Sequence, residues 1–301
     1  VASMPLPSSG GIILAETVGM LDRLGWAGLP AGSAQRAHLL AEAWRRAFAD
    51  RMLLVDPSAA LAGPRELLAG AWLVRRAAGI DPQQATPSAA VGAWSAAPSE
   101  RPETTHLSVI DASRNAVALT TTLNGSFGCG LLVGEVGFLL NNEMDDFTTA
   151  PGQPNLYGLI QGDANAVAPG KRMLSSMSPT VAWRGPELLC LGSPGGSHIP
   201  TATLQTLLAV IVAGPPLAVA VAQPRIHHQW QPDELAFEPG ALGADQLAEL
   251  ARRGHTLRQV SHLGEVDAVL RTAEGEVVAA AHPRGPGATA RSSPSRHPSP
   301  P

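Results

Sequence analysis

The stretch Glu103-Thr104-Thr105-His106-Leu107-Ser108-Val109-Ile110-Asp111 divides the chain into two parts of different character. Before it, apolar residues recur at helical spacing. After it, alternating strand patterns and glycine-rich turns follow. A threonine at an N-terminus carries a nucleophilic hydroxyl and a free α-amine that can act as its general base. Thr104 is therefore the candidate nucleophile, although a Thr-Thr pair alone is also typical of an ordinary β-strand.

Composition excludes several classes of function. The chain has 301 residues, enough to bury a sizeable core, and a formal net charge of −4 without a long basic run. Nucleic acid is therefore not an expected partner. The longest apolar run, residues 207–213, is too short to span a membrane. Cys129 and Cys190 lack the spacing of a metal site, and they could form one disulfide or none.

The first part of the chain reads as helical. The spacing of its apolar residues predicts three helices, over residues 12–24, 33–51 and 64–78. Ser33 is the expected N-cap of the second helix, in which Glu42, Arg46 and Asp50 lie off the apolar face. That face is formed by Ala37, Leu40, Ala41, Trp44 and Phe48.

A linker and a hairpin surround the candidate nucleophile. Residues 79–103 have little periodicity and are rich in Ala, Pro and Ser, which predicts an exposed linker where the backbone can be cleaved. Two strands are then expected over 106–111 and 116–122, joined by a short turn. Antiparallel pairing of these strands would place the Thr122 hydroxyl beside Thr104.

Three later segments carry groups suited to binding charge. Residues 141–146 (Asn-Asn-Glu-Met-Asp-Asp) are either a solvated turn or a site for a cationic amino group. Ser175 and Ser176 offer adjacent hydroxyls, which are also common in ordinary loops. Residues 192–197 (Gly-Ser-Pro-Gly-Gly-Ser) precede an apolar helix over 199–212, so their N–H groups can bind an anion or a developing oxyanion.

The remaining segments suggest structure rather than chemistry. Further strands are expected over 135–140, 181–183, 187–191, 268–271 and 277–281, and a further helix over 243–253. His227 and His228 point opposite ways on a strand and have no third ligand nearby, so a metal site is not favoured. The composition of the chain from residue 283 onward predicts a disordered tail.

Taken together, these segments resemble the γ-glutamyltransferase family of N-terminal-nucleophile hydrolases. The resemblance covers residues 5–283 and rests on motifs in the family's order: PSSGGI, FADR, TTHLSV, LNGSFG, LNNEMDDF, PNLYGL, GDANAVAPGKR, SSMSPT, GSPGGS and PRIHHQW. It implies an α+β fold, a four-layer αββα sandwich that is incomplete because the N-terminal part is missing. It divides the chain into a large-subunit end (1–103, with linker 79–103), a small-subunit catalytic region (104–283) and a disordered tail (284–301).

The resemblance also implies a catalytic centre. Self-cleavage would occur between Glu103 and Thr104, and Thr104 would then form a glutamyl ester. Thr122 would orient the nucleophile, and Gly195 and Gly196 would form the oxyanion hole. No cofactor and no metal are expected.

Donor recognition follows by the same resemblance. Asn124, Glu143 and Asp146 match the residues that hold the donor's α-ammonium, a role that suits acceptor oxygens. The α-carboxylate would be bound by Ser175 and Ser176. Tyr157 matches a lid tyrosine that closes over the donor by reaching Asn124.

The expected partners are glutathione or another γ-glutamyl donor and an amino acid, peptide or water acceptor. We also expect the missing large-subunit portion, or a complementing chain, to supply strands and an arginine for the donor carboxylate. Without that portion, the sandwich would expose sheet edges and apolar surface. Bacterial members are commonly periplasmic or secreted, although the sequence itself carries no sign of location.

Two other functions remain open at this stage. One is an acylase of the same superfamily that acts on glutaryl side chains, which lack the α-ammonium. The presence of Asn124, Glu143 and Asp146 argues against it. The other is an inactive, truncated paralogue that persists as an interaction module.

Overall fold

The computed structural model describes residues 1–58, 63–91, 104–148, 150, 153, 155, 159 and 162–291. Its α-helices are α1 (Gly10–Arg23), α2 (Ala34–Asp50), α3 (Pro64–Leu67), α4 (Gly70–Ala78), α5 (Ser88–Val91), α6 (His198–Leu208), α7 (Leu217–Ala222) and α8 (Ala244–Arg252). Short 3-10 turns are η1 (Trp26–Gly28), η2 (Arg51–Leu53), η3 (Glu143–Asp146) and η4 (Asp163–Asn165). A π-helical turn, η5 (Ala209–Ala213), continues α6.

The strands form one large sheet and three small ones. The five-stranded antiparallel sheet has the order β1-β6-β7-β11-β12, and a three-stranded sheet has the order β10-β9-β8. Two hairpins, β2–β3 and β4–β5, complete the set. The strands are β1 (Ala2–Ser3), β2 (Thr104–Ile110), β3 (Ala116–Thr122), β4 (Leu132–Val133), β5 (Phe138–Leu139), β6 (Thr180–Arg184), β7 (Glu187–Gly192), β8 (Ile226–His227), β9 (Leu235–Phe237), β10 (Leu257–Gln259), β11 (Asp267–Arg271) and β12 (Val277–Ala280).

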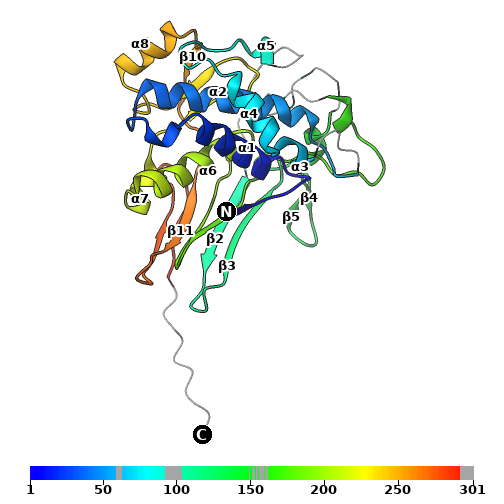
Figure 1. The fold of residues 1–301 in the computed structure, drawn as a ribbon. Helices are drawn as coiled ribbons and strands as arrows, with labels where there is room; N and C mark the ends of the chain where they lie inside the picture. The colour runs from blue at the N-terminus through cyan, green and yellow to red at the C-terminus, as the bar shows by residue number, and fades with distance from the viewer. Residues whose placement is uncertain are drawn as a thin grey trace.

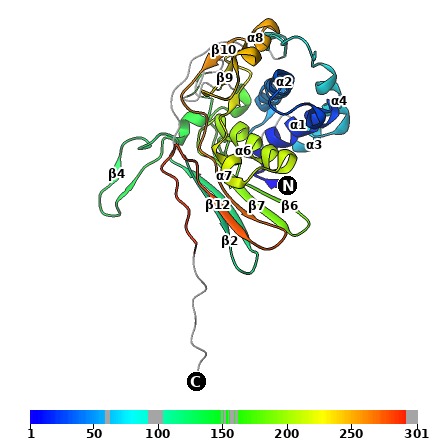
Figure 2. The same ribbon diagram turned by 90° about the vertical axis from the view of Figure 1, so that its left-hand side faces the viewer.

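The elements stack in layers. Helices α6 and α7 pack on one face of the five-stranded sheet, and α1 and α2 lie over α6 (Figures 1 and 2). The β2–β3 hairpin packs on the opposite face, where the Cys190 thiol of β7 lies 3.8 Å from the Val109 carbonyl oxygen. The fold is therefore α+β, with the layer order α-β-β expected for three layers of the sandwich.

The outer face of the β2–β3 hairpin is apolar and uncovered in the part of the chain that the structure describes. Leu107 lies opposite Leu119 and Val109 opposite Val117, and each of these side chains is 42% to 52% exposed. Within the described ranges the β-ladder of each of these two strands pairs it only with the other. The β4–β5 hairpin also projects from the body (Figure 2). The expectation of open edges and exposed apolar surface is thus confirmed.

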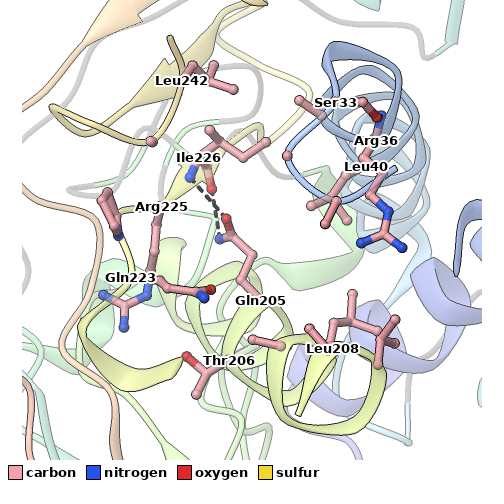
Figure 3. Close-up of a pocket in the computed structure, with 18 of the residues that line it drawn as sticks. Ser33, Arg36, Leu40, Gln205, Thr206, Leu208, Gln223, Arg225, Ile226 and Leu242 are labelled. Carbon is pink, nitrogen blue, oxygen red and sulfur yellow. Dashed lines mark hydrogen bonds between the residues drawn. The ribbon is translucent and has the colours of Figure 1, made fainter. Parts of the chain in front are cut away.

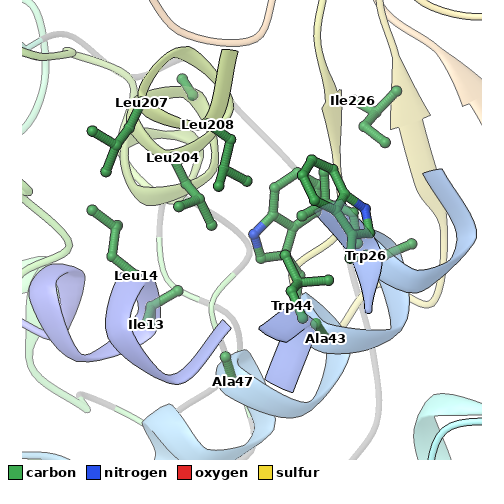
Figure 4. Close-up of a cluster of buried hydrophobic side chains, with 14 of the residues drawn as sticks. Ile13, Leu14, Trp26, Ala43, Trp44, Ala47, Leu204, Leu207, Leu208 and Ile226 are labelled. Atoms are coloured by element: carbon green, nitrogen blue, oxygen red, sulfur yellow. The ribbon is translucent and has the colours of Figure 1, made fainter. Parts of the chain in front are cut away.

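The main core lies between the helices above the large sheet. Trp44 of α2 is fully buried and extends toward Leu204 and Leu208 of α6, with Trp26 and Ile226 beside it (Figure 4). Each such large apolar side chain contributes about 1.5 to 3 kcal/mol when fully buried. This packing holds α2 against α6, and therefore holds the turn from which α6 begins.

Helix α2 begins as predicted, but its polar face is not exposed. Ser33 caps the helix, because its Oγ accepts a hydrogen bond from the Arg36 N–H at 3.2 Å. Glu42, Arg46 and Asp50, predicted to lie off the apolar face, are all buried. Their side chains are paired, as Glu42 Oε2 and Arg46 Nη1 lie 2.7 Å apart. The polar face is covered because α5 and α8 also pack on this helix.

Three other predictions need correction. The helix expected over 64–78 is two helices, α3 and α4, because Ala69 between them has an extended backbone (ψ 138°). The strand expected over 135–140 is a hairpin whose first strand begins at Leu132. The predicted tail is anchored at its start, since Arg284 lies 2.9 Å from Glu238. Residues 292–301 lie outside the described ranges.

The predicted linker is also only partly exposed. The Ser88 side chain is fully buried, and its backbone N–H donates to Asp233 Oδ2 at 2.7 Å. Residues 92–103, which include Glu103, lie outside the described ranges. No helix in the described part of the chain has the length and apolar character needed to cross a bilayer.

Candidate active site

The β2–β3 hairpin brings Thr104 and Thr122 together. The antiparallel register pairs the first residue of β2 with the last residue of β3, as predicted. The Thr104 hydroxyl donates to the Thr122 hydroxyl oxygen, with the two oxygens 3.2 Å apart. The register is set at the other end of the hairpin, where Asp111 Oδ1 accepts the Asn115 N–H at 2.8 Å. A local turn therefore determines which hydroxyls meet.

Asn124 connects this threonine pair to the next polar segment. Its backbone N–H donates to Thr122 Oγ1 at 2.8 Å, and its side-chain amide donates to the Asn142 carbonyl oxygen at 3.2 Å. Asn124 has a φ of 72°, in the left-handed region that Asn tolerates better than most residues. Since Asn142 immediately precedes Glu143, the chain of hydrogen bonds leads from the threonine pair to the acidic turn.

The carboxyl groups of the acidic turn η3 are only partly exposed: Glu143, Asp145 and Asp146 are each intermediate in exposure, whereas Met144 points to solvent. The pKa of Asp146 is raised to about 7, mainly by burial and also by the charges of Glu143 and Asp145, while the charge of Arg51 opposes the shift. Burial also raises the pKa of Glu143, whose Oε1 is buried and has no hydrogen-bond partner among the residues that the structure describes. Two carboxyl groups with raised pKa values suit a cationic ligand, because its charge would favour their ionised forms.

Ser175 and Ser176 are held by Ser9 and Arg51, which precede them by 166 and 125 positions in the sequence. The Ser9 hydroxyl and backbone N–H both donate to the Ser175 carbonyl oxygen, at 2.8 and 2.9 Å. Arg51 Nη2 donates to Ser176 Oγ at 3.4 Å. Sequence reasoning assigned no role to Ser9 or Arg51. A signal was present for both, because Ser9 belongs to the PSSGGI motif and Arg51 ends the FADR motif.

The glycine turn lies directly before α6. Gly195 and Gly196 have φ values of 130° and 55°, conformations that favour glycine. The backbone N–H groups of His198 and Ile199 donate back to the carbonyl oxygens of these glycines, at 2.9 and 3.2 Å. The turn is therefore rigid and sits at the positive end of the α6 dipole, where negative charge is stabilised.

His106 packs between the two sheets. Its ring nitrogens lie 2.8 Å from Thr120 Oγ1 and 2.9 Å from Ser108 Oγ. Burial lowers its pKa to about 4, so the ring is neutral at pH 7. A Cβ placed on Gly192 would lie 2.3 Å from this ring, so only glycine allows β7 to approach β2 so closely. His106 thus helps to set the position of the strand that carries Thr104.

Tyr157, the predicted lid residue, lies outside the described residues. His227 is bonded to Thr201 Oγ1 and Gln229 Oε1, each at 2.8 Å, rather than being free for a metal. Across the described ranges, no group of three or more His, Cys, Asp or Glu side chains is arranged to hold a metal ion. Cys129 and Cys190 are both free thiols.

A cavity of about 380 Å³ lies elsewhere, between α2, α6 and β8 (Figure 3). Its lining contains none of the predicted site residues. The Gln205 side chain in its wall is already bonded to the backbone N–H and carbonyl of Ile226, at 3.0 and 2.9 Å. The cavity is therefore separate from the candidate active site.

Comparison with known proteins agrees with the fold and identifies the family. The family model described as gamma-glutamyltranspeptidase matches residues 1–292. The chain is 43% identical over 286 residues to a glutathione hydrolase proenzyme of Escherichia coli, covering 94% of this chain and 49% of that protein. It is also 43% identical to the glutathione hydrolase proenzyme of Pseudomonas aeruginosa, with 94% and 51% coverage.

Solved structures give the same result. A γ-glutamyltranspeptidase mutant from Helicobacter pylori matches with a TM-score of 0.58 and 45% identity, over 60% of this chain and all of that chain. A cephalosporin acylase from Bacillus halodurans matches with a TM-score of 0.72 over 94% of this chain and 49% of that chain. At 21% identity, this second match shows the fold alone.

The sandwich layers, with a threonine at the start of a strand, define the fold class of the N-terminal-nucleophile hydrolases. Within that class, the chain belongs to the γ-glutamyltranspeptidase family. It spans about half the length of the curated relatives that it matches.

Proposed function

We propose that this chain carries the nucleophile and most of the donor site of an enzyme that transfers or hydrolyses γ-glutamyl groups. The observation that carries the proposal is the contact between the Thr104 and Thr122 hydroxyls at the start of β2. The names of the relatives, glutathione hydrolase proenzymes, support glutathione as a donor and support maturation by cleavage.

Maturation would break the peptide bond between Glu103 and Thr104 with the addition of one water. The cut frees the Thr104 α-amine, which then serves as the base for the Thr104 hydroxyl. Thr122 accepts a hydrogen bond from that hydroxyl and so orients it. The domain division proposed here therefore places residues 1–103 in one subunit and residues 104–283 in the catalytic one, with residues 284–301 as a tail.

The reaction would have two steps. In the first, Thr104 Oγ1 attacks the γ-amide carbonyl of the donor, an ester forms, and the amine leaves with a proton. In the second, water or the amino group of an acceptor attacks the ester carbonyl and releases Thr104. The N–H groups of Gly195 and Gly196 would stabilise the negative charge on the carbonyl oxygen in both steps.

The donor's amino-acid head would be held by two sets of residues. The α-ammonium would contact Asn124, Glu143 and Asp146, whose connected positions and raised carboxyl pKa values suit a cation. The α-carboxylate would contact Ser175 and Ser176. Tyr157 would close over the bound donor, as the resemblance implies.

The apolar outer face of β2–β3 supports a further part of the proposal. We expect the polypeptide that corresponds to the unmatched half of the relatives to cover Leu107, Val109, Val117 and Leu119, either in the same chain or as a second one. This covering layer would complete the sandwich and add an arginine for the donor carboxylate. Activity would then depend on its presence.

The acylase alternative makes a different demand on the same site. A glutaryl group has no α-ammonium, so it gains nothing from the buried carboxyl groups of Glu143 and Asp146. The likeness to the cephalosporin acylase is one of fold alone. A γ-glutamyl anilide and a glutaryl anilide, compared side by side, separate the two functions.

The first test is the intact mass of the purified chain, beside Thr104→Ala. We expect two fragments, split before Thr104, whose masses sum to the precursor plus one water, and no split in Thr104→Ala. Thr104→Ser, which keeps a hydroxyl, should still be cut but more slowly. A wild-type chain that stays whole, even after the relatives' N-terminal half is added, would contradict the proposal.

A further inference from the structure

Arg51 lies beneath the serine pair and is almost fully buried, with 2% of its surface exposed. It is the first residue of η2, at the end of α2. Its Nε donates to Ser9 Oγ at 3.1 Å, and its Nη2 donates to the Leu174 carbonyl oxygen and to Ser176 Oγ, both at 3.4 Å. The guanidinium group thus holds the backbone and a side chain of the serine segment at once.

The charge of Arg51 is compensated in an unusual way. Burial lowers its pKa to about 10, so it remains a cation at neutral pH, and the charge that favours this form is that of Asp146. The pair is electrostatic, since the bonds of the guanidinium shown above go to hydroxyl and carbonyl oxygens. A buried cation of this kind is costly to fold, which favours a role in binding.

The hydrogen bonds also determine whether the hydroxyls of Ser175 and Ser176 are available as donors or as acceptors. Ser176 Oγ accepts a bond from Arg51, and Ser175 Oγ accepts a bond from the Met177 N–H at 3.1 Å. In each case the oxygen is the acceptor, so the hydroxyl hydrogen is left to donate to another group. A carboxylate offers only acceptor oxygens, so two hydroxyls held in this way match it.

We propose that Arg51 is a positioning residue for the α-amino-acid head of the donor. Its guanidinium makes the Ser176 hydroxyl a donor to the α-carboxylate, and its charge favours the ionised form of Asp146 that receives the α-ammonium. The choice of the donor's amino-acid head as the ligand rests on the proposed function. The effect of Arg51 on Ser176 and Asp146 rests on the geometry of this chain. Arg51 acts through these two residues and not by touching the reacting atoms.

The electrostatics of Asp146 support this role. Burial, Glu143 and Asp145 all raise its pKa, and the charge of Arg51 lowers it. Asn155 Nδ2 also reaches Asp146 Oδ1, at 3.5 Å. Removing the guanidinium therefore removes a charge that favours the carboxylate and shifts Asp146 toward the neutral acid, which binds an ammonium group poorly.

The test uses the full chain and the variants Arg51→Met and Arg51→Lys. Arg172→Met is the control, because Arg172 precedes the same serine segment but is exposed and pairs with Asp56 at 2.8 Å. Titration of the Asp146 carboxyl is followed by carbon NMR, with Asp146→Asn for assignment. Affinity for L-glutamate is measured by calorimetry, with glutarate as the ligand that lacks the ammonium group.

We expect Arg51→Met to raise the Asp146 pKa and to weaken L-glutamate binding by about tenfold or more. Arg51→Lys should restore the Asp146 titration, because it keeps the charge, but only part of the affinity, because it lacks the planar fork. Arg172→Met should match the wild type in both. A folded Arg51→Met protein with unchanged titration and unchanged affinity would overturn the proposal.

Two further outcomes are decisive. If Arg51→Met does not fold, the test uses the double variant Arg51→Lys with Ser176→Ala and compares it with the two single variants. If the two losses of L-glutamate affinity are additive, Arg51 does not act through Ser176, and that role is overturned. If the wild type is neither cut before Thr104 nor binds L-glutamate, the proposed function fails. In that case the titration of Asp146 still tests the role of Arg51. An Asp146 pKa that is the same in the Arg51 variants as in the wild type would contradict an effect of Arg51 on Asp146.

Discussion

Replacing Gly192 by alanine tests how the nucleophile strand is positioned. The added Cβ would lie 2.3 Å from His106 Cε1 and 2.4 Å from His106 Nδ1, far inside normal contact distance. The ring cannot move away cheaply, because it is buried between the sheets and bonded to Thr120 and Ser108. We therefore expect the β2–β3 hairpin, which carries Thr104 and Thr122, to shift.

The size of the effect follows from two opposing contributions. An alanine in a strand is favoured over glycine by about 0.5 to 1 kcal/mol, because glycine loses more backbone entropy on folding. Against this, overpacking costs about 1 to 3 kcal/mol, and each hydroxyl left without its histidine partner costs about 1 kcal/mol. The clash dominates, so Gly192→Ala should lower the free energy of unfolding by about 3 kcal/mol.

Urea denaturation and intact mass together provide the assay. Gly192→Ala should unfold at lower urea and should be cut before Thr104 more slowly than the wild type. Gly28→Ala is the matched control, since no atom lies within 4 Å of a Cβ at that position. It should change stability by less than about 0.5 kcal/mol.

A double variant isolates the contact itself. In a His106→Ala background there is no ring to collide with, so the cost of Gly192→Ala should nearly vanish. If Gly192→Ala is as stable as the wild type, the reasoning about the contact is refuted. The same holds if the penalty persists in full after His106 is removed.

Two other predictions concern buried charge around α2. The pKa of Glu16 is raised well above its usual value by burial and by Asp50, so the folded state disfavours its ionisation and loses stability as pH rises above about 4.5. Glu16→Gln should therefore be more stable than the wild type by about 1 to 3 kcal/mol at pH 7.5 and nearly equal to it at pH 4, in urea denaturation at both values. Asp233→Asn removes the carboxylate charge that pairs with buried Arg45 and accepts the Ser88 N–H. We therefore expect the free energy of unfolding to fall by about 2 kcal/mol in the same assay. An unchanged urea midpoint would show that this ion pair contributes nothing to stability.

Much of the catalytic strand was predictable because its information is local. The threonine pair, the short turn and the alternating residues of 104–122 lie within one hairpin, and its register decides that Thr104 faces Thr122. The Ser33 cap and the glycine turn before α6 are likewise set by neighbouring residues. The sequence by itself therefore determined the candidate nucleophile, its hydroxyl partner and the turn that can receive negative charge.

Only the tertiary structure decided what surrounds these groups. Arg51 and Ser176 are 125 residues apart, and no spacing rule predicts that one donates to the other. The pattern of α2 placed Glu42, Arg46 and Asp50 off the apolar face, and it is the packing of α5 and α8 on this helix that helps to bury them. Burial in turn sets the charge of Glu16 and Asp146. Local pattern selects the residues that can react, whereas desolvation and long-range contacts, which depend on packing, set their protonation and orientation.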